Sequence, residues 1–392
     1  MISIAIAGKP NSGKSTLFKA STLANVEIAN YPFTTIGANH GVSYVRVKCP
    51  CLELDERCGN CTDGNRFVPI EMIDVAGLVP DAHKGRGLGN EFLDHLRQAQ
   101  AIIHVIDASG GTDMEGNPVE IGAHDPMEDV AFLEDEIAMW IHGILKRRWT
   151  QLSRKAQYEG LKIEHVLAEQ LAGIGVDDLD AKLAISQRDL DREKPQSWTD
   201  EDLIGLSKLI RAINKPMILA ANKMDVAPPD NIERLMKLDC MVIPSSSEGE
   251  LALRMAAKGK LIKYLPGDQD FEIASEKITS QQRGGLERIR DLLLKYKSTG
   301  VQECLNRTVF DLLNQIVVYP VEDEGKFCDS NGNVLPDAFL MAQGSNPHDL
   351  AYKVHSDIGD GFLYAIDART KRRLGEKNIL EDNDVIKVVS TR

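Results

Sequence analysis

The segment IAIAGKPNSGKST, residues 4–16, places an apolar strand, a glycine-rich turn and the first turn of a helix directly after one another. Gly8, four further residues and then Gly13-Lys14-Ser15 form the pattern G-x-x-x-x-G-K-[ST]. In a strand–loop–helix context, such a loop aims backbone N–H groups and the positive end of the helix dipole at an anion. The segment therefore predicts a phosphate-binding loop that holds a nucleoside triphosphate.

Two side chains of this loop have predicted roles of their own. Lys14 is expected to reach the β- and γ-phosphates, and the Ser15 hydroxyl to ligate Mg²⁺. The alternative is a chance glycine-rich turn, which the flanking strand and helix patterns disfavour. The residues predicted to contact the nucleotide here are Lys9, Pro10, Asn11, Ser12, Gly13, Lys14, Ser15 and Thr16.

A second motif, Asp74-Val75-Ala76-Gly77, follows the apolar strand pattern at residues 67–73. An aspartate at a strand end can hold Mg²⁺ through water, and a glycine three residues later can offer its amide to the γ-phosphate. Alone, the motif means little, because acidic residues and glycines often end strands. Its position after a phosphate-binding loop makes a nucleotide role the favoured interpretation.

A third motif, Asn222-Lys223-Met224-Asp225, follows the apolar run at residues 216–221. A carboxylate that accepts two hydrogen bonds from guanine N1 and N2 would reject adenine, which lacks that donor pair. An ordinary strand-end turn is the alternative if this motif is taken alone. A further strand leads to residues 245–248 (SSSE), where Ser246 and Ser247 are predicted to approach the base. Together, the ordered motifs favour a guanine nucleotide.

The set GKPNSGKS, DVAG, NKMD and SSSE resembles a translation-factor-class GTPase. Residues 30–35 (NYPFTT) resemble the first switch of the Obg family, and residues 74–93 (DVAGLVPDAHKGRGLGNEFL) resemble the second switch of its YchF branch. Near the end of the chain, GSNPHDLA at residues 344–351 resembles a TGS domain, which has a ubiquitin-like β-grasp fold.

The resemblance implies roles residue by residue. Thr35, with Thr34 as the less favoured choice, would ligate Mg²⁺ and sense the γ-phosphate. Asp74 would carry the outer shell of the metal, and Gly77 would contact the γ-phosphate. Asn11 would help to coordinate K⁺ beside the phosphates. Lys14, Thr35, Gly77 and Asn11 are thus the expected catalytic set.

The base-binding side has its own implied roles. Asn222 and Asp225 would read the base, and Lys223 would pack over the nucleotide. The implied reaction is hydrolysis of GTP to GDP and phosphate. The implied partner is a ribosome or an RNA, bound through the TGS domain and a helical insertion. The basic cluster at residues 146–148 fits either an RNA contact or a solvated helix face.

Leu78 stands where many small GTPases have a glutamine that orients water. A leucine cannot position water by hydrogen bonding, so intrinsic turnover should be slow and needs another aid, such as K⁺. Alternating glycines at residues 84–89 favour a switch segment that γ-phosphate orders, against a plain flexible loop.

Three alternatives to a GTPase remain open. The first alternative is an ATPase of similar build, because many YchF-like proteins depart from N-K-x-D and accept ATP. The NKMD motif of this chain favours GTP. The second is a nucleotide-dependent switch with negligible hydrolysis, which Leu78 keeps open. A nucleoside or metabolite kinase is third, because it leaves the guanine-reading motifs unexplained.

Strand patterns that alternate with helical ones predict an α/β fold: a P-loop NTPase domain with a mainly parallel sheet and helices on both faces. Apolar residues recur at three- and four-residue spacing after Met127 without a strand pattern, which predicts a helical insertion. A helical pattern is also expected from Gln281 to Tyr319. The expected domains are residues 1–126 and 210–275 (P-loop domain), 127–209 (insertion), 276–316 (connecting helices) and 317–392 (TGS).

Four of the seven cysteines, Cys49, Cys51, Cys58 and Cys61, lie within residues 49–61, at the tip of an expected hairpin. C-x-C followed by C-x₂-C can wrap a tetrahedral Zn²⁺; reduced thiols without a ligand are the alternative. Four thiolates would close the coordination sphere, so a structural zinc is expected rather than a catalytic one.

The composition restricts partners and location. A formal net charge of −13 argues against a surface that generally binds nucleic acid, and no DNA partner is expected. No apolar run approaches the ~20 residues that span a bilayer. An odd number of cysteines without an export signal favours a reducing, cytoplasmic location.

Overall fold

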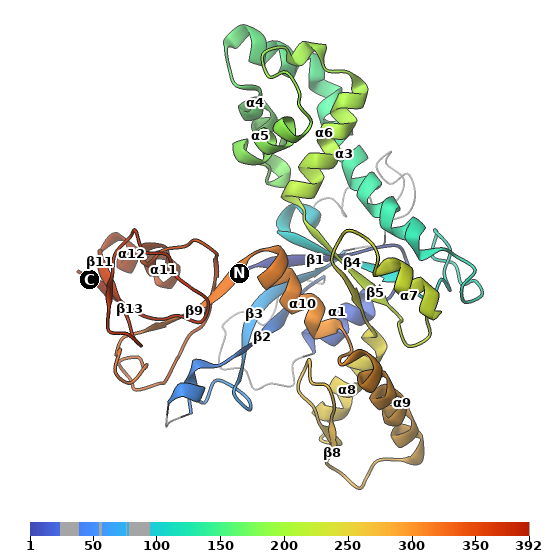
Figure 1. The fold of residues 1–392 in the computed structure, drawn as a ribbon, viewed down its shortest axis with the longest axis vertical. Coiled ribbons are helices and arrows are strands. Elements are labelled where there is room, and N and C mark those ends of the chain that lie inside the picture. Colours follow the sequence, from blue (N-terminus) through green and yellow to red (C-terminus); the bar gives the residue numbers. More distant parts are fainter. Residues whose placement is uncertain (24–38, 55–56, 76, 78–94, 392) are drawn as a thin grey trace.

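The computed structural model describes residues 1–23, 39–54, 57–75, 77 and 95–391. At its centre lies a six-stranded sheet with the order β2-β3-β1-β4-β5-β6 (Figure 1). β2 is antiparallel to β3, and the other neighbours are parallel, which confirms the predicted mainly parallel sheet. The strands are β1 (Ser3–Ala7), β2 (His40–Lys48), β3 (Asn65–Asp74), β4 (Ala101–Asp107), β5 (Met217–Asn222) and β6 (Val242–Pro244).

Helices cover both faces of this sheet, as expected. Successive side chains of a strand point to opposite faces. Ile4 and Ile6 of β1 therefore join a buried cluster with Leu17 of α1 (Lys14–Thr22), whereas Ala5 and Ala7 join a different cluster with the helices that follow β4. The phosphate-binding loop begins where β1 leaves this double-sided core.

The chain between β4 and β5 is mostly helical and projects from the sheet (Figure 1). Leu133, Ile137 and Ile141 of α3 are buried, in agreement with the apolar spacing. Asp125 caps α3 by accepting a hydrogen bond from the Met127 amide. The elements are α3 (Pro126–Glu159), α4 (Ile163–Leu171), η3 (Ala172–Ile174), α5 (Asp178–Gln187), η4 (Pro195–Ser197) and α6 (Asp200–Asn214).

Short strands and helices follow β5. They are α7 (Pro229–Leu235), α8 (Ser247–Lys258), β7 (Ile262–Lys263), β8 (Glu272–Ile273), α9 (Ser280–Tyr296), α10 (Val301–Arg307) and a π-helical turn, η5 (Thr308–Leu312). The helical pattern expected up to Tyr319 is wrong at its end, because β9 already begins at Gln315. The run QIVVYPV is rich in β-branched residues, which favour a strand.

The C-terminal residues form a five-stranded sheet of order β10-β9-β13-β11-β12, in which only β9 and β13 are parallel neighbours. This confirms the predicted small C-terminal sheet domain, called the C-terminal domain below. Its elements are β9 (Gln315–Val321), β10 (Phe339–Ala342), α11 (Pro347–Val354), α12 (Ser356–Asp360), β11 (Phe362–Asp367), β12 (Arg373–Leu374) and β13 (Val385–Ser390).

One part of the β2–β3 hairpin extends beyond the central sheet. β3 pairs with β1 only at residues 71–74, but it pairs with β2 from Asn65 to Ile73. Residues 43–48 and 65–70 therefore form a two-stranded ribbon, whose tip contains the 3₁₀ turn η1 (Pro50–Glu53) and the four clustered cysteines. Within the described part of the chain, no helix is long and apolar enough to cross a bilayer.

Candidate nucleotide site and cysteine cluster

The phosphate-binding loop depends on glycine at both ends. Gly8 and Gly13 have φ angles of 147° and 101°, which side chains rarely allow. A Cβ on Gly8 would lie 2.4 Å from the Val105 carbonyl oxygen, and one on Gly13 would lie 2.1 Å from Nδ2 of Asn222. The loop is thus fitted tightly between β4 and the end of β5.

Lys14, Ser15 and Asp74 come together beside this loop. The Lys14 ammonium donates to the Lys9 carbonyl oxygen at 2.7 Å, and its side chain is largely buried. The Ser15 side chain is hydrogen-bonded to the Asp74 carboxylate at the end of β3. A hydroxyl and a carboxylate in contact form a donor set that suits Mg²⁺. The sequence-predicted magnesium ligands Ser15 and Asp74 are therefore neighbours.

Burial shapes the charges of these groups. Burial lowers the pKa of the Lys14 ammonium to about 8, against the opposing effect of the Asp74 carboxylate. Burial also raises the pKa of the Asp74 carboxyl group, against the hydrogen bond with Ser15 and the charge of Lys14. A bound triphosphate would place negative charge next to the Lys14 ammonium and so favour its protonated form.

This lysine leads to a pH-dependent prediction. Because nearby phosphates favour the charged ammonium, nucleotide binding should raise the pKa of Lys14 and take up ~0.5 proton at pH 8. The sign makes GTP affinity highest below pH 8 and lower as the pH rises through this value. Calorimetric titrations at pH 8, in two buffers of different ionisation enthalpy, measure the uptake.

The control for proton uptake is a second lysine of the same helix. We expect the variant Lys19→Gln, which changes an exposed side chain, to take up the same fraction of a proton as the wild type. The variant Lys14→Gln should show no uptake. Uptake that is the same in wild type and Lys14→Gln would contradict the assignment of this proton to Lys14.

The start of the loop is fixed by a buried polar network that the sequence did not predict. The Lys9 ammonium pairs with Asp129 of α3 at 2.8 Å and donates to the Thr112 carbonyl oxygen at 2.7 Å. Nε2 of His124 lies 2.7 Å from the Asp129 carboxylate. Asn11, with φ 59°, donates to the Gly116 carbonyl oxygen at 2.9 Å. The segment after β4 therefore closes against the phosphate-binding loop.

Asn222 links three segments of the site. Its Nδ2 donates to the Ser12 carbonyl oxygen at 3.0 Å, while its Oδ1 accepts from the amide and hydroxyl of Ser247 at 3.0 and 2.9 Å. Its side chain thus holds the phosphate-binding loop against the start of α8. The structure adds this cross-linking role to the base contact that the motif predicts.

The turn after Asn222 carries the other two motif residues. Lys223 has φ 62°, and its ammonium bonds Asp107 at the end of β4 at 2.8 Å. Asp225 is exposed on a turn that two main-chain hydrogen bonds fix, from Met224 to Ser245 and from Val226 to Lys223. The Asp225 carboxylate is accordingly available to a ligand.

The remaining predicted nucleotide residues lie around the same loop. Ser246 caps α8 by accepting from the Gly249 amide at 3.2 Å, and Thr16 is half-buried in the first turn of α1. A Cβ on Gly77 would lie 3.0–3.2 Å from atoms of Pro10, so this glycine sits directly on the loop. Thr35 and Leu78, together with the glycine-rich segment 84–89, lie outside the described residues.

Two buried hydroxyls near these motifs have no hydrogen-bond partner among the described residues. They belong to Ser12, in the phosphate-binding loop, and to Ser245, directly after β6. Buried polar groups are normally paired, so each unpaired hydroxyl is a position for a ligand or a water. Their location is consistent with a nucleotide at this end of the sheet.

The four clustered cysteines converge at the tip of the ribbon. All four Sγ atoms lie within 4.8 Å of one another, with Cys49 and Cys58 at 3.6 Å and Cys51 and Cys61 at 3.5 Å. A tetrahedral zinc with Zn–S bonds of about 2.3 Å requires sulfur atoms roughly 3.8 Å apart. The cluster therefore has the donor set and the spacing that can hold Zn²⁺.

A strand–loop–helix phosphate site, a strand-end aspartate and an N-K-x-D turn define the class of P-loop GTP-binding proteins. Residues 3–135 match a family described as "50S ribosome-binding GTPase", residues 220–323 match "Obg-like GTPase YGR210-like, G4 motif-containing domain", and residues 332–390 match "TGS domain". A GTP-binding protein of Methanocaldococcus jannaschii is 54% identical over 100% of this chain and 99% of its own length. The chain belongs to the Obg-like GTPase family, in the YGR210-like branch that is related to YchF.

Two further similarities support this assignment. A GTP-binding protein of Schizosaccharomyces pombe is 34% identical over 88% of each chain. The crystal structure of a GTP-binding protein from Pyrococcus horikoshii covers 100% of both chains, with 43% identity and a TM-score of 0.79. The fold and the guanine-nucleotide class expected from the motifs are thus confirmed.

Proposed function

We propose that the protein hydrolyses GTP to GDP and phosphate, and that this cycle controls its binding to a ribosome-linked partner. The observation that supports hydrolysis best is the convergence of Lys14, Ser15 and Asp74 beside one phosphate-binding loop. The Lys14 ammonium, together with a Mg²⁺ ion held by Ser15 and Asp74, would neutralise the charge that develops during phosphoryl transfer.

Each side chain has a defined part in this proposal. Lys14 binds the β- and γ-phosphates, and the Gly77 amide contacts the γ-phosphate. Ser15, Thr35 and Asp74 hold Mg²⁺, which neutralises phosphate charge when it is bound. Asn11 helps to hold K⁺ near the phosphates and so compensates for Leu78.

The base is held on the opposite side of the loop. Asp225 accepts hydrogen bonds from guanine N1 and N2, and Lys223 covers the nucleotide, while Asn222, Ser246 and Ser247 fix the surrounding main chain. ATP is the second candidate. A ribosome-binding ATPase, YchF of Bacillus subtilis, is 32% identical over 63% of this chain.

The proposal of a ribosome partner rests on the names of related proteins and not on a binding site among the described residues. The names of the YchF relative and of the matched N-terminal family both refer to ribosome binding. We assign the contact to the C-terminal domain and to the helical insertion at residues 127–209. In the insertion, Lys146 already pairs with Asp200 at 2.8 Å, so this part of its basic cluster is partly neutralised.

We assign the cysteine cluster to a structural Zn²⁺ and keep the domain division expected from the sequence. Four thiolates leave no open position for substrate, which argues against zinc catalysis. Residues 1–126 with 210–275 would bind nucleotide, 276–316 would connect, and 317–392 would contact the partner, except that β9 places Gln315 and Ile316 in the C-terminal domain.

Turnover in potassium tests the proposed hydrolysis. We expect K⁺ to raise the GTPase rate at least about 10-fold over Na⁺, although by less than the roughly 10³–10⁵ that an arginine finger contributes. The measurement is phosphate release, with and without ribosomes. Asn11→Gly removes the side chain without straining φ 59°, and should lose the potassium effect.

The comparison has a clear negative outcome. Equal, minimal turnover in both salts, with and without ribosomes, would favour a nucleotide-dependent binding switch without significant hydrolysis. Co-sedimentation of the same samples with ribosomes, under a GTP analogue, GDP or no nucleotide, then reports whether binding follows the nucleotide.

A further inference from the structure

The cysteine cluster lies in the contact between the ribbon and the C-terminal domain, rather than at a free hairpin tip. Cys49, Cys51 and Cys58 belong to one buried apolar cluster with Phe327 and Leu335 of the C-terminal domain. Cys49 and Cys51 are at most 2% exposed. The side chains that would hold the metal are therefore part of an interdomain core.

Hydrogen bonds also join the ribbon to the C-terminal domain near the cysteines. The Arg66 guanidinium donates to the carbonyl oxygens of Leu335 and Pro336 at 3.1 and 3.0 Å. Asn60, between Cys58 and Cys61, also donates to the Leu335 carbonyl oxygen, at 3.3 Å. The Leu335 backbone thus accepts two hydrogen bonds from the ribbon, one of them from within the cysteine loop.

An ion pair adds a further contact between the ribbon tip and the C-terminal domain. Glu53 follows Cys51 by two residues, and its two carboxylate oxygens lie 2.7 and 2.9 Å from the Arg369 guanidinium. Such bidentate pairs fix orientation as well as distance. The Arg369 guanidinium also donates to the Asn383 carbonyl oxygen at 2.8 Å, so it is engaged within the protein.

Tyr319 of β9 completes this interface. It is fully buried in the apolar cluster that contains Cys49 and Cys58, and its hydroxyl has no hydrogen-bond partner among the described residues. The interface therefore encloses a buried phenol next to the cysteine cluster.

We propose that zinc bound by Cys49, Cys51, Cys58 and Cys61 fixes the C-terminal domain on the ribbon. The metal would hold Glu53 and Asn60 in place for their contacts with Arg369 and Leu335. This inference rests on the proposed zinc occupancy and is independent of GTP hydrolysis. Thiol–thiol hydrogen bonds are weak, so the same loop without metal would hold the interface poorly.

Two cysteine variants of the full-length protein test the proposal. Cys61→Ser changes the least buried ligand by one atom, and Cys240→Ser is the matched control outside the cluster. Both proteins are prepared without added zinc. We expect close to one zinc per chain in wild type and Cys240→Ser, and a several-fold lower content in Cys61→Ser.

Amide hydrogen exchange reports the interface in the same samples. Residues 327–340 should exchange at least ~10-fold faster in Cys61→Ser, whereas β4 in the central sheet stays protected. Zinc chelation of wild type, followed by addition of zinc, should produce and reverse the same change if the variant folds poorly. A third protein, Arg66→Gln, should keep its zinc but lose protection at residues 333–338.

Two results would overturn the proposal. The first is that the wild-type protein contains no zinc and its residues 327–340 still exchange slowly. The second is stoichiometric zinc whose removal leaves this exchange unchanged, which would make the metal a local support of the ribbon tip. GTP affinity, measured alongside, separates either result from a failure of the nucleotide assignment.

Discussion

Asp225→Asn is expected to weaken GTP binding at least ~100-fold and to create affinity for xanthosine triphosphate. A carboxylate accepts from both N1–H and the 2-amino group of guanine. An asparagine amide instead places its own N–H₂ against that amino group. Xanthine carries an oxygen at this position, so it complements the amide. Competition of GTP, ATP and xanthosine triphosphate for the purified protein measures the change.

Asp230→Asn is the matched control for this exchange. Asp230 is also exposed and lies five residues further on, in the first turn of α7. We expect this variant to keep the wild-type preference. Equal affinities of wild type for GTP and ATP would instead support the ATP-binding alternative, and an unchanged preference in Asp225→Asn would remove Asp225 from the base site.

Asn222→Ala should lower both stability and nucleotide affinity. The substitution leaves the Ser12 carbonyl and the Ser247 amide and hydroxyl without their partner. Buried groups that lose a partner cost about 1–3 kcal/mol each, so the loss of three partners should lower the free energy of unfolding by at least about 3 kcal/mol. GTP affinity should fall roughly 10- to 100-fold, because the loops that hold the nucleotide are no longer fixed to each other.

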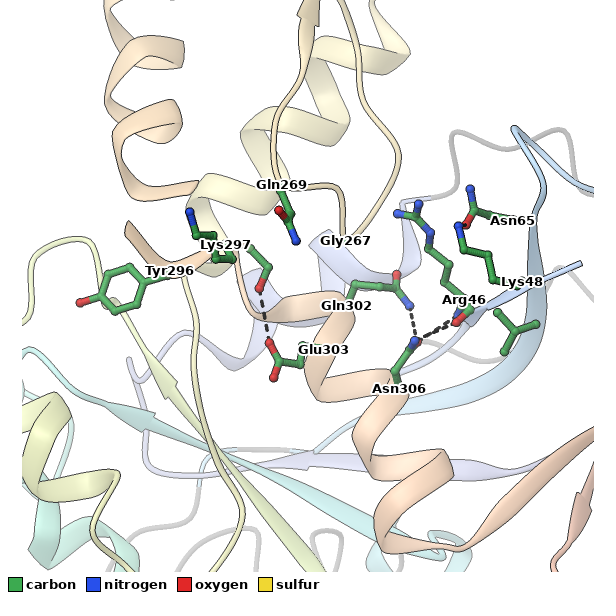
Figure 2. Close-up of a pocket in the computed structure, with 12 residues that line it drawn as sticks. Arg46, Lys48, Asn65, Gly267, Gln269, Tyr296, Lys297, Gln302, Glu303 and Asn306 are labelled. Carbon is green, nitrogen blue, oxygen red and sulfur yellow. Dashed lines mark hydrogen bonds between the residues drawn. The ribbon is translucent and has the colours of Figure 1, made fainter. Parts of the chain in front are cut away.

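Asn306→Ala offers a control with the same number of broken hydrogen bonds. Figure 2 shows Asn306 of α10 among the residues that line a cavity of about 440 Å³, and none of these residues belongs to the phosphate-binding loop. Its amide group makes three hydrogen bonds, two with the Arg46 main chain and one with Gln302. We expect a comparable loss of stability in denaturant titrations without nucleotide, but wild-type GTP affinity. Equal affinity losses in both variants would mean that global stability, and not loop geometry, controls binding.

The sequence predicted the features that a short stretch of chain determines. The phosphate-binding loop could be recognised because strand, glycines, lysine and helix start within residues 4–16. The cysteine cluster could be recognised because its spacing suits tetrahedral zinc. Asn222 was placed at the base by its motif, but its cross-link to Ser12 and Ser247 depends on how three distant segments pack.

Long-range pairs were beyond sequence reasoning for a physical reason. The ion pair of Lys9 and Asp129 joins residues 120 positions apart, and Asp129 lies in an acidic helix start where carboxylates ordinarily face water. Only the packing of α3 against the sheet selects that carboxylate. The helical pattern expected up to Tyr319 failed because the β-branched run of β9 pairs with β10 and β13, strands that lie later in the chain.

The length of β3 means that a small tilt at its Asp74 end would displace its Asn65 end much further. β3 has ten residues and so spans roughly 33 Å. It runs from Asn65, near the cysteines, to Asp74, which is hydrogen-bonded to Ser15 beside the phosphate-binding loop. A tilt of about 5° at the Asp74 end would displace the far end by roughly 3 Å over that length. The C-terminal domain, held at the far end, would then amplify a small adjustment at the phosphates into a displacement comparable to the length of a hydrogen bond.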